Sequence, residues 1–228
     1  MTTIDLAARE ALQQVAVHVV ARRRHAVTGR FGLRPAPGGL ATPVFGDGEV
    51  VRVSGAVLAV ERGGDVRAEP LTTLARAAAL VGVDLAEEFS VGDETPPMVE
   101  PGARLPVDAA TVRAVGDWWG LAATAMDQLV ATTPAVSGAT AAQLWPEHFD
   151  HACTVAVNGE VQLNVGASPG DSFEPAPYLY VGPWGPDRPG DPGYWNASFG
   201  AVLRQADVAG VPDALAFLRR GVELVAAG

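Results

Sequence analysis

The chain has 228 residues, 48% of them apolar, and a formal net charge of −10 with sixteen arginines and no lysine. This apolar content excludes disorder of the whole chain and is sufficient for a sizeable core. The negative charge argues against nucleic-acid binding, because phosphate backbones would repel it. No run of about 18 apolar residues is present, so we expect no membrane span.

The beginning of the chain and its single cysteine both bear on location. Residues 1–10 include Asp5, Arg9 and Glu10, where a secretory signal would have a basic start and then an unbroken apolar stretch. Cys153 can form no internal disulfide, and its apolar neighbours predict a buried thiol of low reactivity. We therefore expect a cytoplasmic protein.

The first predicted element is an amphipathic helix. Apolar residues recur at spacings of three and four from residue 4 to residue 24, and Gly29 is positioned to end the helix. A basic run at residues 22–25 falls in its last turn. Such a run can contact nucleic acid, but cations at a helix C-terminus are favoured by the dipole, and we prefer that interpretation.

A β-meander and a second helix are predicted next. Residues 30–34, 40–45 and 49–60 are short β-prone runs separated by proline and glycine. Residues 62–65, Arg-Gly-Gly-Asp, are typical of a hairpin turn. From residue 72 the apolar spacing indicates a short helix capped by a threonine hydroxyl.

An irregular connection and a long helix are predicted between the first meander and the strands of the second half. Residues 90–107 are rich in proline, glycine and acids, which predicts an irregular segment. Asp108 is a suitable N-cap for a helix over residues 109–131, and residues 132–140 form a second break.

A hairpin and further strands follow that break. Asn158-Gly159 is a strong turn signal between strands at residues 152–157 and 160–165. Residues 178–181 and 197–203 are predicted as further strands. A terminal helix begins near Pro212.

The two halves also share short sequences. Residues 55–58 and 200–203 both read Gly-Ala-Val-Leu, and both precede a predicted helix. We interpret this as an internal duplication, with one half at residues 1–90, a Pro-rich connection and long central helix at 91–140, and the other half at 141–228. The fold class is therefore α+β, with mainly antiparallel sheets covered by helices and all parts packed as a single globular unit.

Several motifs of the second half resemble a bacterial family, of the actinobacterial type, that is known only as a domain of unknown function. The resemblance lies in Trp145 and the Phe-Asp pair at 149–150, in the Gly-Ala-Ser-Pro-Gly turn at 166–170, and in Pro-Tyr-Leu-Tyr at 177–180. The closing helix at 211–218 also fits. The resemblance covers mainly residues 140–225 and implies no established activity.

The Gly-Ala-Ser-Pro-Gly sequence formally matches the nucleophile elbow of α/β-hydrolases. In that elbow the residue after the serine donates its N–H to the oxyanion hole, and Pro169 has none. The required histidine downstream is also missing, since the last histidine is His151. We interpret residues 168–171 as a turn between strands.

A polar cluster precedes the hairpin and leaves three interpretations open. Glu147, His148, Asp150 and His151 have metal-ligand chemistry, although a strand beginning near Asp150 would place Asp150 and His151 on opposite faces. His148 and Asp150 could form an acid/base pair. A hydrogen-bonded turn at the strand entry is the interpretation that we favour, so we expect neither a metal ion nor a cofactor.

Aromatic residues are dense after residue 177, and Tyr178 and Tyr180 share one strand face. We predict a pocket near these strand ends for a planar or sugar-like metabolite, and we leave open whether a reaction occurs there. Its predicted lining residues are Trp145, His148, Asp150, Asn164, Ser168, Asp171, Tyr178, Tyr180 and Trp184. The alternative is a non-catalytic interaction or assembly protein, in which a protein partner meets the acidic, Pro-rich segment 90–107 and three aromatics that we expect to be exposed, Trp184, Tyr194 and Trp195.

Overall fold

The computed structural model describes residues 4–91 and 95–228 and shows an α+β protein with one five-stranded and one six-stranded antiparallel sheet. This confirms the predicted class. The chain divides into two compact units, Met1–Asp117 with Leu144–Phe149, and Trp118–Gln143 with Asp150–Gly228. Positions 92–94 of the expected connection lie outside the described residues.

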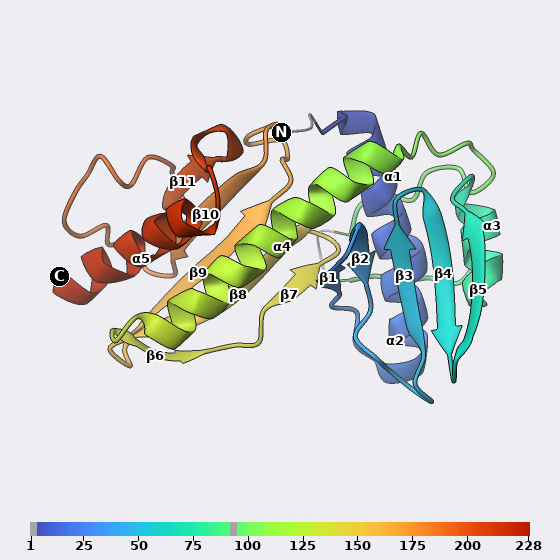
Figure 1. Cartoon of the computed structure of the whole chain (residues 1–228), viewed down its shortest axis with the longest axis horizontal. Helices are drawn as coiled ribbons and strands as arrows, with labels where there is room; N and C mark the ends of the chain where they lie inside the picture. Colours follow the sequence, from blue (N-terminus) through green and yellow to red (C-terminus); the bar gives the residue numbers. More distant parts are fainter. Residues whose placement is uncertain (1–3, 92–94) are drawn as a thin grey trace. The chain divides into compact units, whose positions relative to one another are not determined.

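The helical elements are α1 (Leu6–Val15), η1 (Ala16–Ala21), α2 (Arg22–Thr28), α3 (Leu74–Val81), α4 (Ala109–Thr132), η2 (Gln205–Asp207) and α5 (Val211–Ala227). The strands are β1 (Arg34–Ala36), β2 (Gly39–Ala41), β3 (Val50–Ser54), β4 (Val57–Arg62), β5 (Asp65–Pro70), β6 (Val136–Ala139), β7 (Gln143–Trp145), β8 (Asp150–Val157), β9 (Val161–Ser168), β10 (Tyr178–Pro183) and β11 (Ala201–Arg204). Figure 1 shows them in chain colours.

The sheet of the first unit is a simple meander in the order β1-β2-β3-β4-β5. The β4–β5 hairpin pairs Arg62 with Asp65, so its loop is the Gly63-Gly64 pair that the sequence predicts. Strand β5 itself was not predicted, because most of its residues are exposed and half of them are charged. Helix α3 packs against this edge of the sheet, with Thr73 as its N-cap.

The helix before this sheet is continuous from α1 to α2 and contains a π-helical stretch, η1. All six residues of η1 are buried. A helix that is apolar on one side only would leave some of them exposed, so this stretch is covered on all sides. Gly29, with φ 67°, ends the helix in the left-handed region, as predicted.

Part of that cover is the Pro-rich segment at residues 95–101. The side chain of Gln14 donates to Pro97 O (3.0 Å) and accepts from Val99 N (3.0 Å), and His18 Nε2 lies 3.0 Å from Pro96 O. The segment has no helix or strand, which confirms the irregular structure predicted for it. It is nevertheless fixed to the helix by side-chain hydrogen bonds.

The sheet of the second unit has the order β11-β10-β9-β8-β6, and β7 pairs with β8 off this path. One face is apolar and carries Cys153, Val165 and Val181, which lie in register across β8, β9 and β10. Helix α4 packs on this face, because Met126 Sδ lies 4.0 Å from Cys153 Sγ. Helix α5 also packs there, since a Cβ on Gly221 would lie 2.9 Å from Val181 Cγ1. The opposite face is left for polar and aromatic residues.

Several local predictions for the second half are confirmed. Helix α4 begins after Asp108, whose Oδ2 accepts from Thr111 N (2.7 Å), and β8 and β9 form the expected hairpin around Asn158 and Gly159. Cys153 is buried, and burial raises the pKa of its thiol to about 11. Strand β6 lies inside the predicted break at 132–140, so that break is partly wrong. In the described part of the chain, no helix combines the length and apolar character needed to cross a membrane.

Candidate functional site

Seven of the nine predicted site residues belong to the second unit, on or next to strands β8, β9 and β10. The period of two in these strands places Asp150, Gly166 and Tyr180 on the face away from α4 and α5, because their neighbours Cys153, Val165 and Val181 face the helices. This polar face is the candidate site.

The centre of the polar face is a hydrogen bond from the Tyr180 hydroxyl to Asp150 Oδ2. Tyr180 lies on β10 and Asp150 on β8, so the tyrosine ring must cross β9. It crosses at Gly166, which is the register partner of both Tyr180 and Ala152. A Cβ at Gly166 would lie 2.6 Å from Tyr180 Oη and 2.8 Å from Ala152 Cβ. Only glycine at this position leaves room for the ring.

A second tyrosine–carboxylate pair lies beside the first. Tyr178 donates to Asp171 Oδ2 (2.6 Å), and the other oxygen of Asp171 accepts from the backbone N–H groups of Phe173 and Glu174. Ser168 Oγ accepts from Gly170 N (3.1 Å) and lies 3.4 Å from Asp171 Oδ2. These bonds confirm the turn interpretation of residues 168–171, and Ser168 is buried rather than presented as a nucleophile.

Burial, reinforced by the adjacent carboxylates, raises the pKa of both Tyr178 and Tyr180 well above its usual range. Both hydroxyls are therefore protonated at neutral pH and act as hydrogen-bond donors. A phenolate base is excluded at these positions under those conditions.

Phenylalanines from two loops extend the aromatic surface of this face. Phe173 packs edge-on against Tyr178 (5.9 Å between ring centroids) and against Phe199 (5.1 Å), and Phe199 packs against Tyr180 (6.4 Å). Phe173 is 51% exposed and Phe199 37%. Neither residue was predicted for the site: Phe173 lies in a loop, and Phe199 lies in a turn before β11, within the range 197–203 that was predicted as a strand.

Trp184 and Asn164 form a separate part of the polar face. The indole Nε1 of Trp184 donates to Asn164 Oδ1 (2.8 Å), and the same oxygen accepts from Thr154 Oγ1 (2.9 Å). Trp184 is nevertheless 66% exposed. A large apolar ring is thus held in one orientation while most of its surface remains in water.

A cavity of about 850 Å³ lies at Trp184, within the second unit. Its walls include Val161, Gln162 and Pro183 from the strand ends, Val225 from α5, and Arg188 from the following loop. Arg188 fixes that loop, because it donates to the carbonyls of Gly185, Asp187 and Phe199 at 2.8–2.9 Å. The wall is therefore formed before any ligand arrives.

The other two predicted site residues, Trp145 and His148, belong to the first unit. Trp145 packs against Phe31 with ring centroids 6.3 Å apart, and His148 is exposed. They are therefore described with the first unit, and their place in the ligand site stays a prediction.

The metal-ligand interpretation receives no support from the described residues. His151 lies on the buried face of β8, in register with Ala167, whereas Asp150 bonds Tyr180 on the other face. Burial lowers the pKa of His151 to about 4. No group of three or more His, Cys, Asp or Glu side chains suited to a metal occurs within residues 4–91 and 95–228.

Two aromatics that were predicted for an interaction surface, Tyr194 and Trp195, form hydrogen bonds within their own unit. Tyr194 donates to Phe217 O (2.9 Å), and Trp195 Nε1 donates to Pro189 O (2.8 Å). Both are half-buried, so the expectation that they are exposed is wrong. Tyr194 thus holds the loop before β11 against α5, and Trp195 bonds another part of the same loop.

No protein-family model, curated protein or solved structure matches the chain. The resemblance to a domain of unknown function therefore stays a prediction, and the functional argument depends on the geometry of the site.

Proposed function

We propose that the second unit binds a small planar or sugar-like metabolite against Trp184, in the cavity of about 850 Å³. The observation that carries this proposal is that the indole ring of Trp184 is largely exposed and is also held in one orientation by a hydrogen bond. Keeping an indole exposed forgoes roughly 2 kcal/mol of burial, and the bond from Asn164 orients the ring without covering it. Such a preorganised ring is suited to stacking, because little side-chain entropy is lost when a ligand binds.

The chemistry of the walls narrows the ligand class. Val161, Pro183 and Val225 provide apolar contact, whereas Gln162 supplies an amide that can donate and accept. Arg188 uses both terminal nitrogens on backbone carbonyls, so it is less available as an anion clamp. A neutral ligand with one flat face and polar edges fits these walls better than a multiply charged one. We expect this binding to take place in the cytoplasm.

A thermal-shift screen with nucleosides, monosaccharides and aromatic amino acids tests the proposal. A ligand at about 100 times its Kd stabilises the folded state by about 2.7 kcal/mol, which corresponds to roughly 5–10 °C for a chain of this size. The shift should disappear in Trp184→Ala and be reduced in Asn164→Ala. Phe173→Ala, which removes an exposed aromatic outside the cavity, is the control and should bind normally. If no compound raises the melting temperature of the folded wild-type chain, the proposal is wrong.

A second function, a protein interaction through the same face, is favoured by one observation. Phe173 and Phe199 are exposed neighbours and form, with Trp184, a set of large apolar residues in the loops around β10. Sedimentation of the purified chain measures self-association directly. A concentration-dependent dimer that Phe173→Ser abolishes, while Trp184→Ala does not, would support assembly through the phenylalanines. A monomer at all concentrations excludes self-assembly.

A further inference from the structure

Three arginines of the first unit line one cavity of about 480 Å³. Arg23 comes from α2, Arg62 from the end of β4 and Arg67 from β5. The acids in the same wall are Glu49 and Asp65, so the formal charge of the lining is three minus two, or +1. This local excess of positive charge occurs in a chain whose net charge is −10.

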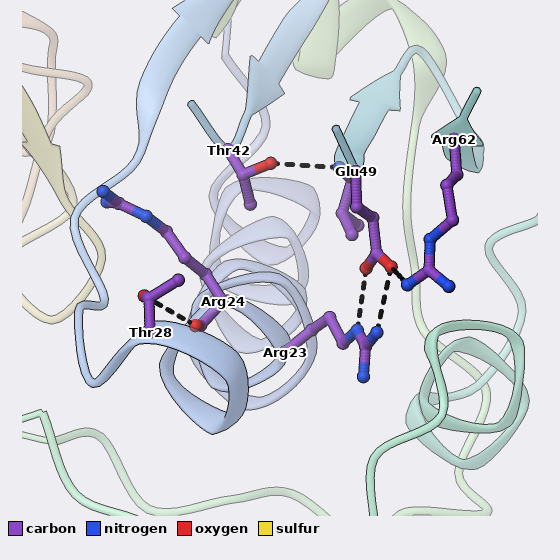
Figure 2. Close-up of polar contacts among 7 residues, drawn as sticks. Arg23, Arg24, Thr28, Thr42, Glu49 and Arg62 are labelled. Carbon is purple, nitrogen blue, oxygen red and sulfur yellow. Dashed lines mark hydrogen bonds and ion pairs between the residues drawn. The ribbon is translucent and has the colours of Figure 1, made fainter. Parts of the chain in front are cut away.

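Glu49 organises the arginines and is not itself available to a ligand. Its side chain is only 3% exposed. Arg23 binds it in a bidentate manner, Nε to Oε1 at 2.7 Å and Nη2 to Oε2 at 2.9 Å, and Arg62 Nη2 donates to Oε2 (Figure 2). The hydrogen bonds from Arg23, followed by those from Arg62, hold the pKa of Glu49 below its usual range. Glu49 therefore stays ionised and fixes the position of two cations.

The hydrogen bonds to Glu49 leave several N–H donors of the surrounding arginines without an acceptor among the described residues. The bonds to Glu49 occupy Nε and Nη2 of Arg23 and only Nη2 of Arg62. The side chain of Arg67 makes no hydrogen bond or ion pair with another described residue, although its backbone belongs to the β4–β5 ladder. It lies in register with Val60, which places it on the buried-side face of the sheet next to Arg62 and Asp65. Arg62 and Arg67 thus offer several N–H donors at one cavity.

The last turn of α3 forms the remaining wall of the cavity, and this wall is apolar. Leu80 and Val81 contribute apolar side chains there. A helix C-terminus disfavours an anion by roughly two- to fivefold. That effect is smaller than a charge-assisted hydrogen bond to a guanidinium, which changes affinity by roughly tenfold or more. The N–H groups of Gly82 and Val83 also bond back to Ala78 O, which reduces the exposed negative end.

We propose that this cavity binds a small monocarboxylic acid, whose carboxylate bonds Arg62 and Arg67 and whose short alkyl part packs against Leu80 and Val81. One negative charge matches the formal +1 of the lining, and a planar carboxylate matches the guanidinium fork better than a phosphate of higher charge does. The site uses residues of the first unit only, so it is independent of the metabolite cavity at Trp184.

The test is a titration of the full chain with butyrate at constant ionic strength, followed by ¹H–¹⁵N NMR of the arginine Nε–Hε groups and of the backbone amides at residues 80–82. Saturable shifts of these signals are expected. Arg67→Gln should raise the Kd for butyrate about tenfold. It should leave the rest of the amide spectrum unchanged, because the side chain of Arg67 makes no bond that folding needs.

Three controls make the result decisive. Butyramide, a neutral analogue of the same shape, should bind at least tenfold more weakly than butyrate. The variant Arg104→Gln removes an exposed arginine outside the cavity and should bind butyrate as the wild type does. Trp184→Ala should also leave butyrate binding unchanged. The proposal is overturned if butyrate produces no saturable shift, if inorganic phosphate binds more tightly than butyrate, or if Arg67→Gln and Arg104→Gln weaken binding equally.

Discussion

The hydroxyl of Tyr180 reaches the carboxylate of Asp150 by crossing a whole strand of the sheet. Tyrosine side chains on a sheet normally contact the adjacent strand, and here the adjacent position is Gly166. The ring lies over the glycine, and the hydroxyl bonds the next strand but one. This arrangement connects β8, β9 and β10 through one side chain.

The first prediction concerns that crossing. Gly166→Ala should destabilise the chain by about 1–3 kcal/mol, because the new methyl group would displace Tyr180 and orphan its hydrogen bond to Asp150. Gly138→Ala on β6 is the matched control, since a Cβ there meets no atom within 4 Å. Its effect should be within about 0.5 kcal/mol. Urea unfolding of the two variants measures the difference, and equal midpoints would contradict the steric argument.

The second prediction separates the two residues that the sequence suggested as an acid/base pair. Asp150→Ala should lower the free energy of unfolding by about 1–3 kcal/mol, because the buried hydroxyl of Tyr180 loses its acceptor. His148→Ala should be nearly neutral, since His148 is exposed.

A double-mutant cycle with Tyr180→Phe tests the cause of the Asp150→Ala effect. The two losses should be strongly non-additive if the hydrogen bond is responsible. Additive losses, or a negligible effect of Asp150→Ala alone, would exclude a structural role for this pair.

The third prediction is a pH dependence that arises from His151. Burial lowers its pKa from 6.5 to about 4 in the folded chain. Between these values the unfolded chain binds a proton that the folded chain does not, so stability rises with pH from about 4 to about 6.5 and is lost as pH falls through that window. The full contribution is roughly 3 kcal/mol.

His151→Gln tests this contribution, because glutamine retains hydrogen-bonding groups and does not titrate. Unfolding free energies measured at several pH values from 4 to 7 should depend less steeply on pH in the variant. Some slope should remain, because burial also lowers the pKa of His18. An unchanged slope in His151→Gln would show that His151 is not the group responsible.

The fourth prediction compares two glutamates of the first unit. Glu49→Gln should destabilise the chain by roughly 1–3 kcal/mol, because the partly exposed guanidinium groups of Arg23 and Arg62 lose their charged acceptor. Glu61→Gln, whose partner Arg52 is similarly half-exposed, should cost less than about 1 kcal/mol. Chemical denaturation of both variants at pH 7 gives the two values. A loss for Glu49→Gln no larger than that for Glu61→Gln would rule out a structural role for the buried carboxylate.

Local patterns were sufficient to predict much of the fold. Helix α4 and the hairpin around Asn158-Gly159 follow from periodicity and turn chemistry, which depend on neighbours in sequence. Strands β5 and β6 could not be predicted in this way, because they are short and most of their residues are exposed, so neither forms a buried apolar face. Their positions are set by pairing with β4 and β8.

The candidate sites were harder to predict than the fold, because their residues are brought together by tertiary structure. The sequence does place Tyr178 and Tyr180 on one strand face, but their partners are set by register, and Asp150 is 30 residues from Tyr180. The helix dipole was the preferred explanation for the basic run at 22–25, whereas Arg23 binds Glu49, 26 residues away. No local signal distinguishes an arginine that will meet a buried carboxylate from one that will stay in water.

The π-helical stretch η1 determines which way the helix beyond it points. An α-helix turns about 100° per residue, and a π-bulge accommodates one extra residue in a turn. An uninterrupted α-helix of the same sequence would therefore rotate Arg23 by about 100° away from the direction in which it meets Glu49. Deleting one residue within η1 should restore a regular helix and keep Arg23 in phase, so this buried stretch is a place where the chain can change its length without losing its ion pair.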